Sequence, residues 1–259
     1  LVKISKKTRD AKIPVFKDRV SKIVFLQKYR PNRKYKKKIK SNLKQLNDDF
    51  RRVKQFNRYC LNKDVLDFGC GWGVFLSHLK KAKSLTGIEL RNDCLNYIKK
   101  KNKKIILHKN LENSNEKFDI ITLFHVLEHI PYQIDTLKKL KKCLKKKGKI
   151  IIEVPHAKDF LLSCNDLKEF KDFTFWSEHL ILHTYISLKK MLVKAGYKKI
   201  KISYFQRYNL NNHFGWLIKK KPGGHKFFKN IFSKKQNEQY VKSLIKFQQT
   251  DTLIAEASI

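Results

Sequence analysis

A glycine-rich turn between an apolar run and a helical pattern is the feature that most constrains how this chain can fold. Residues 67–73 read Asp-Phe-Gly-Cys-Gly-Trp-Gly and follow the apolar pair Val65-Leu66. Three closely spaced glycines allow a tight turn and leave bare backbone that a ligand can approach. Val74 stands where the G-x-G-x-x-G fingerprint of nicotinamide enzymes needs its last glycine. No Gly-Lys-Ser/Thr follows, so neither that fingerprint nor a P-loop is present.

Short apolar runs alternate with amphipathic helical patterns from about residue 63 onward. This alternation is typical of βαβ units that build a parallel sheet. It predicts an α/β fold with a Rossmann-like, doubly wound sheet of seven strands, and ligands are expected at the carboxyl ends of the strands. The expected strands are 64–68, 84–89, 104–107, 118–124, 149–154, 199–205 and 252–255.

The remaining segments lack this alternation. Residues 1–60 are polar and basic without a strand pattern, so we expect an N-terminal helical cap with a helix from about residue 35 to residue 59. Residues 158–183 are irregular and aromatic and are expected to form a lid over the sheet. Residues 206–249 form an insertion with a Pro-Gly-Gly turn and a helix.

The chain is strongly basic, with 60 Lys and Arg against 22 Asp and Glu and a formal net charge of +38. Of the basic residues, 51 are Lys and only 9 are Arg, whereas recognition of base edges and phosphates favours Arg. The lysines are also spread along the chain, which indicates a solvated surface. The pattern argues against a nucleic-acid partner without excluding one, and it suits an acidic small molecule.

The cysteine spacing and the apolar runs bear on disulfides, on metal sites and on the location of the protein. The five cysteines are odd in number and no two share C-x-x-C spacing, so neither a disulfide framework nor a zinc ribbon is predicted. No run of 18 apolar residues exists, which argues against a membrane-spanning helix. The first residues build no apolar stretch of the signal-peptide kind, so a cytoplasmic location is expected.

An acidic residue ends the second expected strand. Glu89 stands 20 residues after Gly69, at a place where a carboxylate can accept hydrogen bonds from ribose hydroxyls. Residues 65–75 together with Glu89 resemble motifs I and II of class I S-adenosylmethionine (SAM)-dependent methyltransferases. The resemblance spans about residues 65–200. Its other matching segments are 118–121 and 125–129, like the family's strand-four region, and 148–155, like its strand-five region.

This resemblance implies a cofactor and the residues that hold it. SAM would be the methyl donor, with S-adenosylhomocysteine as the product. Asp67 and the three glycines would hold the amino-acid part of SAM, and Glu89 the ribose. Asn110 stands where the family often has an acid that meets the adenine, and Phe124 and His125 would lie near the methyl group. The implied cofactor contacts are Asp67, Gly69, Cys70, Gly71, Gly73, Glu89, Leu90, Asn110, Leu111, Phe124 and His125.

The segment His125-Val126-Leu127-Glu128-His129 also spells the H-x-x-E-H motif of a class of zinc proteases. Zinc ligation in that class needs both histidines on one face of a continuous helix. Here an apolar strand ends just before the motif and Pro131 follows soon after it, so we predict no metal site. His125 is the candidate general base, because an unperturbed imidazole has a pKa of about 6.5. Glu128 and His129 are expected to cap and hydrogen-bond the following helix.

Three residues outside the glycine-rich turn are expected to contact the methyl acceptor. They are His156 after the fifth strand, His179 in the aromatic segment and Arg207 at the start of the insertion. Loops carry binding residues more often than the scaffold does. A narrower resemblance, to bacterial methyltransferases of surface-polysaccharide or sugar-nucleotide biosynthesis, implies a glycosyl or sugar acceptor. It rests on the aromatic segment, the Ala-Gly-Tyr helix end, 206–208, 221–225 and 251–255.

The sequence thus predicts a SAM-dependent methyltransferase that methylates a small molecule, most readily an oxygen of a sugar or glycan precursor. An RNA methyltransferase and a non-catalytic SAM-binding protein stay open as alternatives. The region after the fourth strand carries neither the N-P-P-[YF] nor the Pro-Cys motif of base-modifying enzymes. The parts of the chain in this interpretation are a helical cap (1–60), a SAM-binding core (61–157), a lid (158–183), a core helix with strand six (184–205), an acceptor-side insertion (206–249) and a last core strand (250–259).

Overall fold

A computed structural model describes residues 1–27, 43–111, 116–164, 167–229 and 231–259. The expected helix from about residue 35 lies partly outside the described residues, and its described part is α1 (Leu43–Cys60). Among the residues described, no helix is both long and apolar enough to cross a bilayer.

A seven-stranded sheet forms the centre of the molecule, in the order β10-β11-β8-β7-β4-β5-β6. All seven expected strands lie in it, so the predicted Rossmann-like α/β fold is confirmed. β11 is antiparallel to both of its neighbours, β8 and β10, and the other neighbouring pairs are parallel. The strands are β4 (Asp64–Phe68), β5 (Ser84–Ile88), β6 (Ile105–His108), β7 (Phe118–Phe124), β8 (Leu144–Pro155), β10 (Lys198–Phe205) and β11 (Thr252–Ser258).

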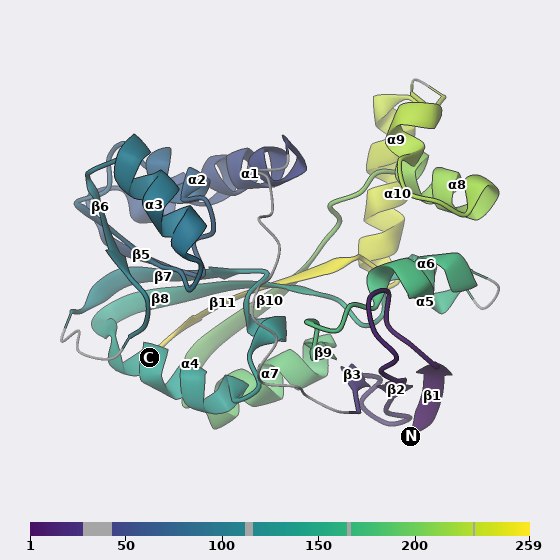
Figure 1. Cartoon of the computed structure of the whole chain (residues 1–259), viewed down its shortest axis with the longest axis horizontal. Helices are drawn as coiled ribbons and strands as arrows, with labels where there is room; N and C mark the ends of the chain where they lie inside the picture. The colour runs from purple at the N-terminus through teal and green to yellow at the C-terminus, as the bar shows by residue number, and fades with distance from the viewer. Residues whose placement is uncertain (28–42, 112–115, 165–166, 230) are drawn as a thin grey trace.

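Helices cover both faces of this sheet (Figure 1). On one face lie α1, α2 (Val74–Ser77) and α3 (Asn92–Lys101), which bury Phe56, Phe75 and Ile98 against the strands. On the other face lie α4 (Gln133–Lys142) and α7 (Tyr185–Lys194), whose leucines form a second buried cluster with the sheet. α7 begins with a capping box, in which the side chains of Thr184 and Ser187 accept each other's backbone N–H. The sheet therefore holds the carboxyl ends of β4, β5, β7 and β8 at one common edge.

The first 26 residues contain three short strands and no described helix. The predicted helical cap over residues 1–60 is therefore wrong for this part of the chain. β1 (Val2–Ser5), β2 (Val15–Lys17) and β3 (Val24–Leu26) make an antiparallel sheet that β9 (Ile181–Leu182) completes. Each of the three strands has only three or four residues, too few to show an alternating pattern. Val15 and Val24 are buried against Phe175 and Leu182, so contacts with a distant segment stabilise these strands.

The residues predicted to be an irregular lid contain two short helices, α5 (Phe160–Ser163) and α6 (Lys168–Thr174), besides β9. The insertion forms α8 (Leu210–Lys219), α9 (Gly224–Phe227) and α10 (Lys234–Lys246), which project beside α5 and α6 (Figure 1). Trp216 of α8 packs against Leu161, Leu167 and Phe170. The insertion and the lid thus share one small apolar core.

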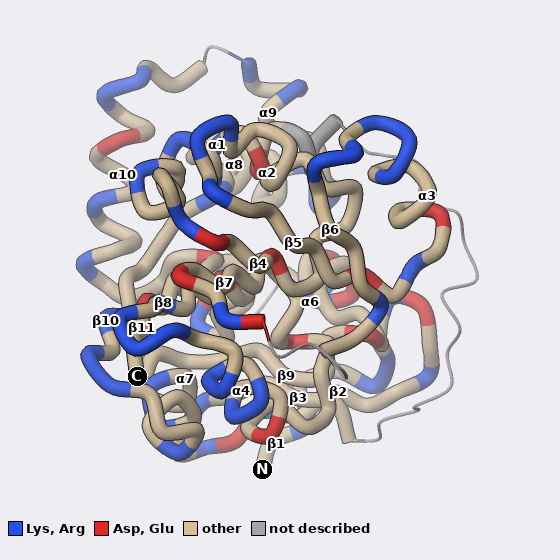
Figure 2. Tube along the Cα trace, turned by 90° about the vertical axis from the view of Figure 1, so that its left-hand side faces the viewer, with Lys and Arg blue, Asp and Glu red and all other residues tan. Residues whose placement is uncertain are grey.

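Lysine and arginine residues lie on many of the outer helices and turns, including α1, α3, α4, α7 and α10 (Figure 2). Figure 2 shows these basic residues distributed over the view instead of collected on a single element. The acidic residues are fewer, and several of them lie among the strands. This distribution agrees with the solvated surface that the spread of lysines along the sequence predicts.

Candidate functional site

The glycine-rich turn follows β4 at the edge where the parallel strands end. Gly69, Gly71 and Gly73 have φ angles of 80°, 54° and 68°, in the left-handed region that favours glycine. A Cβ atom at Gly69 would lie 2.4 Å from Cγ2 of Val126, so β4 and the segment after β7 approach each other closely. A Cβ at Gly71 would meet no described atom within 4 Å, so the space above this residue is open.

Asp67 and Cys70 support the turn from beneath. Asp67 is buried, and its carboxylate accepts a hydrogen bond of 2.7 Å from Oγ1 of Thr122 on β7. Burial raises the pKa of Asp67 to about 7, and the bond from Thr122 opposes part of this shift. Cys70 is also buried, and burial raises the pKa of its thiol above the ordinary value. These two side chains therefore hold the turn against the sheet.

Glu89 meets the glycine-rich turn directly after β5. Its carboxylate accepts hydrogen bonds of 2.9 Å from the backbone N–H of Gly71 and of Arg91. The neighbouring strand end contributes Asn110, which is exposed, and Leu111, which is half-buried, while Leu90 is exposed beside Glu89. The expected cofactor residues of β4, β5 and β6 thus stand at three adjacent strand ends.

His125 follows β7 with a φ of 54°, and its backbone N–H donates to the carbonyl of Glu153 over 2.8 Å. Nδ1 of its ring lies 3.2 Å from Oε1 of Glu128. Nε2 lies 3.2 Å from Oε1 of Glu153 and 3.2 Å from Nη1 of Arg207. Nε2 accepts from Arg207 when it carries no proton and donates to Glu153 when it is protonated. The ring therefore stands between a cation and two carboxylates.

Opposing influences act on the pKa of His125. Burial and the Arg207 cation lower it, whereas the bonds to Glu128 and Glu153 raise it and outweigh them, so the pKa lies above its ordinary value. The two carboxylates respond in the opposite sense. Burial raises the pKa of Glu128, but His125 and its neighbours reduce that pKa to about 2. The pKa of Glu153 is likewise held well below the usual range, because His125 and Arg52 outweigh its burial.

Glu153 is the fully buried centre of a charged cluster on β8. Both of its oxygens accept hydrogen bonds from Nη2 of Arg51, at 2.7 and 2.9 Å, and Nη2 of Arg52 donates over 3.0 Å. Both arginines belong to α1. Arg207 joins the cluster from the start of the insertion, where it contacts the carboxylate of Asp48. Four separate parts of the chain thus meet at the ends of β7 and β8.

Phe124 forms the apolar floor beside this cluster. Its ring stacks on Phe56 with centroids 5.7 Å apart and meets the edge of Phe75 at 5.0 Å. The guanidinium of Arg52 lies 4.8 Å from the centroid of the Phe124 ring, a distance suited to a cation–π contact. Phe124 is 9 % exposed, so most of its ring packs between α1 and α2 and little of it is available to a ligand.

The three residues expected on the acceptor side occupy different environments. Arg207 lies beside His125, as described above. His179 lies with Glu128 and His129, one ligand atom of each being within 4.8 Å of those of the other two. His156 is 1 % exposed, and its Nδ1 pairs with the carbonyl of Thr250 over 2.9 Å. The structure therefore brings Arg207 and His179 to the end of β7 and places His156 in the interior.

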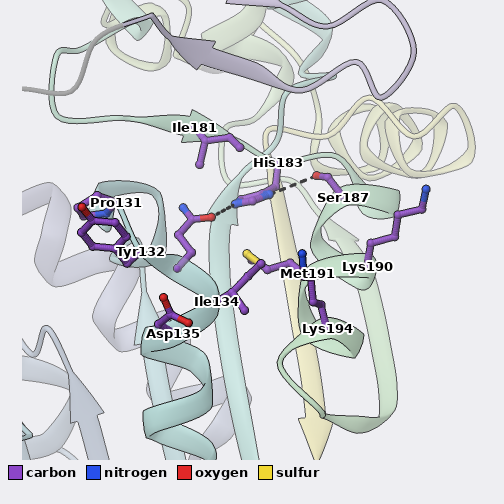
Figure 3. Close-up of a pocket in the computed structure, with 11 residues that line it drawn as sticks. Pro131, Tyr132, Ile134, Asp135, Ile181, His183, Ser187, Lys190, Met191 and Lys194 are labelled. Carbon is purple, nitrogen blue, oxygen red and sulfur yellow. Dashed lines mark hydrogen bonds between the residues drawn. The ribbon is translucent and has the colours of Figure 1, made fainter.

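A pocket of about 510 Å³ lies between the start of α4 and the helix α7, on the face of the sheet opposite to α2. Figure 3 shows His183 among the residues that line it, with Nε2 3.0 Å from Oε1 of Gln133 and Nδ1 3.2 Å from Oγ of Ser187. Both nitrogens of the ring are thus paired, and burial lowers the pKa of His183 to about 4. A neutral imidazole with two side-chain partners fits a structural role.

Sequence reasoning missed Glu153 and the residues of α1 that surround it. One signal was present, because Glu153 interrupts the apolar run Ile150-Ile151-Ile152 in a strand expected to be buried. A charged residue is almost never fully buried unless it is paired. Arg51 and Arg52 carried no comparable signal, since they lie in a helix with many other basic residues. The expected helix-capping role of Glu128 also fails, because that carboxylate faces His125.

Three curated proteins are similar to parts of this chain. It is 35% identical over 112 residues to an uncharacterised protein of Methanocaldococcus jannaschii, which covers 42% of this chain and 48% of that protein. It is 32% identical over 106 residues to a ubiquinone biosynthesis O-methyltransferase of Hydrogenovibrio crunogenus, covering 37% and 44%. It is 28% identical over 152 residues to a tRNA U34 carboxymethyltransferase of Wolinella succinogenes, covering 54% and 53%. The chain spans about half the length of the curated relatives it matches.

A solved structure and a family match cover more of the chain. A SAM-dependent methyltransferase from Archaeoglobus fulgidus matches with a TM-score of 0.58 and 19% identity, over 83% of this chain and 94% of that one. At this identity the likeness shows the fold. Residues 27–202 match the family described as a methyltransferase domain. The glycine-rich turn, Glu89 and the strand order all lie within or around that match, and the chain therefore belongs to the methyltransferase domain family, with the class I fold and SAM as its cofactor.

Proposed function

We propose that this chain transfers the methyl group of SAM to a hydroxyl group of a small-molecule acceptor. The observation that carries the proposal is the juxtaposition of two features at one edge of the sheet. The glycine-rich turn and Glu89 offer a cradle at the ends of β4 and β5. The imidazole of His125 stands at the end of the adjacent strand β7, held by Glu128 and Arg207.

The residues present fit SAM. The open space above Gly71 leaves room for a ligand against the backbone, since a Cβ there would meet no described atom within 4 Å. Each oxygen of Glu89 accepts one backbone N–H, and Oε1 also lies 3.5 Å from Nε of Arg91, so Oε2 keeps a second lone pair for a ribose hydroxyl. Nε1 of Trp72, in the same turn, is a buried donor without a partner among the described residues. Such a donor usually has a partner when its site is complete.

Bound SAM supplies an electrophilic methyl group on a sulfonium centre. The acceptor oxygen forms the new bond to the methyl carbon as the carbon–sulfur bond breaks, and the electron pair of that bond stays on sulfur. In this proposal the hydroxyl proton passes to Nε2 of His125, which then donates to Glu153 instead of accepting from Arg207. Glu128 and Arg207 are positioning residues that fix the ring, because alignment of reacting groups contributes much of the rate.

Support for the acceptor class is uneven. The relative from Hydrogenovibrio crunogenus is named as an O-methyltransferase, which agrees with a hydroxyl as the methylated group. The proposed sugar or glycan acceptor rests on the narrower sequence resemblance alone, and the names of the relatives reported above mention no sugar. We keep the sugar acceptor as the first class to test, together with a cytoplasmic location.

RNA is the second candidate acceptor, and the net charge of +38 is the observation that favours it. Lysine-rich surfaces bind phosphate backbones without sequence preference, and such binding weakens steeply with salt. The relative from Wolinella succinogenes is named as a tRNA-modifying enzyme. An RNA methyltransferase would use the same cofactor site. In a label-transfer experiment, it would place the methyl label in RNA instead of in a sugar.

Label transfer separates these acceptors. The purified chain is incubated with methyl-labelled SAM and a lysate divided into RNA, protein, lipid and sugar-nucleotide or glycan pools. Label in the sugar pool that resists ribonuclease is the expected result. Label in RNA would replace the sugar acceptor by RNA, and label in lipid would replace it by a lipid. SAM binding with no label in any pool would favour a non-catalytic SAM-binding protein.

His125→Ala tests the proposed base. The ring lies outside the glycine-rich turn, so we expect SAM binding, measured by calorimetry, to remain within about threefold of the parent chain. Turnover should fall by about 10² to 10⁴, which is the range that general base catalysis contributes. Ser77→Ala, at the exposed last residue of α2, is the control for handling and folding. Unchanged turnover in His125→Ala would remove this residue as the base.

A further inference from the structure

We propose that Glu128, His129 and His179 form a binding site for a zinc-like divalent transition-metal ion beside His125. Only the catalytic role of the ion rests on the proposed function. The binding site itself is formed by side chains at the end of β7. It departs from the sequence prediction that the chain has no metal site. The departure arises because the third ligand comes from a segment 50 residues beyond His129.

The three side chains converge from two elements. Glu128 and His129 lie in the short 3₁₀ helix η1 (Leu127–His129), which follows β7. His179 lies in the turn before β9, and the backbone N–H of Leu180 donates to the carbonyl of Glu128 over 2.8 Å. One ligand atom of each residue lies within 4.8 Å of the other two. Donor atoms around a tetrahedral zinc ion are about 3.3 Å apart, given bonds of about 2.0–2.1 Å. The ligand atoms would therefore have to draw together by up to about 1.5 Å, the difference between 4.8 and about 3.3 Å, when the ion binds.

Two buried polar atoms at this place have no hydrogen-bond partner among the described residues. They are Oε2 of Glu128, on a residue with no exposed surface, and Nδ1 of His179. Leaving a buried polar atom unpaired is unfavourable, and more so for a charged group. A carboxylate oxygen and a ring nitrogen are both ligands that zinc uses. A cation bound by Glu128 and His179 would give both side chains a partner.

His129 is held in the orientation that a ligand needs. Its Nδ1 lies 2.8 Å from the carbonyl oxygen of Glu178, which can accept only, so Nδ1 carries the proton and donates. The lone pair is then on Nε2, which lies 4.0 Å from Oε1 of Glu128. Metal-binding histidines almost always donate their other ring N–H to a carbonyl or carboxylate in this way.

Aromatic rings and the N-terminal sheet fix the second element. The rings of His129 and His179 lie 4.9 Å apart, and Trp176 meets the edges of both at 6.3 and 5.6 Å. β9 follows directly and pairs with β3, so the segment that carries His179 is anchored to the first strands of the chain. This support keeps the two backbone segments side by side, so that side-chain movement alone is needed to bind the ion.

Two imidazole nitrogens and one carboxylate oxygen identify the kind of ion. This donor set is used by catalytic zinc sites, which keep a position open for water or substrate. Mg²⁺ and Ca²⁺ prefer ligands that are all oxygen. If the proposed methyl transfer holds, an ion here polarises an acceptor hydroxyl bound at its open position, close to His125, and so eases loss of the proton.

Metal content tests the site without any use of activity. The purified full chain is treated with a chelator, dialysed against buffered Zn²⁺, and measured by mass spectrometry for metal per chain. We expect one Zn²⁺ per chain, and at least about a tenfold loss of affinity in His129→Gln and in His179→Gln. His78→Gln is the matched control, because His78 is exposed, its Nδ1 bonds to the carbonyl of Val74 and its ring contacts Phe50, away from the proposed ligands. Circular dichroism and a thermal melt show that each variant is folded.

X-ray absorption at the zinc edge identifies the ligands. We expect only nitrogen and oxygen neighbours at about 2.0–2.2 Å. The chain has five free cysteines, which are the competing place for the ion. Sulfur neighbours at about 2.3 Å would place the ion on those cysteines and overturn the inference. Stoichiometric binding of Mg²⁺ without binding of Zn²⁺ would overturn it as well.

Calorimetry with SAM distinguishes failure of this inference from failure of the proposed function. Folded protein that binds SAM but not Zn²⁺ would overturn the metal site and leave methyl transfer standing. Protein that binds Zn²⁺ through nitrogen and oxygen ligands but does not bind SAM would support the metal site and overturn the proposed function.

Discussion

His125 combines an unusual backbone with a crowded ring. Its φ of 54° is in the left-handed region, where a residue other than glycine costs about 1–3 kcal/mol. The N–H bond to the carbonyl of Glu153 holds the backbone there, and this turn directs the ring toward Glu128, Glu153 and Arg207. The strain is therefore tied to the position of the imidazole at the end of β7.

Glu153→Gln keeps the shape of the buried side chain and removes its charge. Arg51 and Arg52 then face a neutral amide, and breaking a buried ion pair costs about 3–5 kcal/mol. We expect the free energy of unfolding in urea to fall by about this amount. The control is Glu256→Gln, whose carboxylate is 18% exposed and pairs with Lys149, and which should cost about 1 kcal/mol or less. Equal losses would contradict a special role for the cluster around Glu153.

Gly69→Ala and Gly71→Ala separate the two roles of the glycine-rich turn. Alanine at position 69 forces Cβ to within 2.4 Å of Val126 and adds overpacking of about 1–3 kcal/mol to the backbone cost. Alanine at position 71 meets no described atom and bears only the backbone cost of about 1–2 kcal/mol. We expect Gly69→Ala to lower the melting temperature more, and Gly71→Ala to weaken SAM binding more. Tight SAM binding by Gly71→Ala would remove the open space at this residue from the cofactor site.

At the scale of elements, α1 is the described helix of the N-terminal region that sequence assigned to a helical cap. Its arginines reach Glu153 on β8, and Phe56 packs on Phe124 of β7. The helix thereby covers the carboxyl ends of two central strands. Its attachment combines one apolar contact with one buried charge cluster.

Phe56→Ala tests the apolar part of this attachment. The side chain is 1 % exposed, and truncating a buried phenylalanine costs about 3–5 kcal/mol because it leaves a cavity. Phe50→Ala, in the same helix but 48% exposed, should cost less than about 1 kcal/mol. Urea unfolding of both variants gives the comparison. Similar costs at the two positions would mean that α1 does not pack through Phe56.

The strands that could be predicted from the sequence are those in which buried residues form a continuous apolar run. Ile150-Ile151-Ile152 in β8 and Val65-Leu66 in β4 are examples, because central strands of a parallel sheet are buried on both faces. Prediction failed for β1, β2 and β3, whose few residues gain their burial only from Phe175 and Leu182 far along the chain. The glycine-rich turn, Glu89, His125 and Arg207 could be picked out by residue type and spacing. Glu153 and the pairing of His179 with Glu128 depend on which strands become neighbours, and no local pattern contains that information.

For the molecule as a whole, buried titratable groups make stability depend on pH in two opposite ways. Burial lowers the pKa of His156 and of His213 to about 4, from an ordinary 6.5. The unfolded chain then binds more protons, so this part of the stability is lost as pH falls from about 6.5 to 4. Burial and the nearby Asp251 raise the pKa of Asp159 to about 8, from 3.8. Here the folded chain binds more protons, so stability falls as pH rises from about 4 to 8.

Asp159→Asn isolates the loss of stability with rising pH that is due to Asp159. The amide resembles the protonated acid and can still accept the hydrogen bond from the N–H of Leu161 that caps α5. Relative to the parent chain, its free energy of unfolding should rise by up to about 1.4 kcal/mol for each pH unit between 5 and 8. Urea unfolding at four pH values measures the difference. Asp135→Asn, at the exposed start of α4, is the control for loss of one acidic side chain. A difference that is constant with pH would show that Asp159 is ionised in the folded chain.

The position of β11 has a consequence for how the chain is made. This strand lies between β8 and β10, and its Leu253 and Ile254 are buried. Residues 252–258 therefore lie inside the sheet, although they follow the six other strands of that sheet in the sequence. Until they emerge from the ribosome, β8 and β10 lack the strand that joins them. An exposed strand edge is a template for wrong pairing, so the nascent chain should depend on chaperone protection until β11 is synthesised.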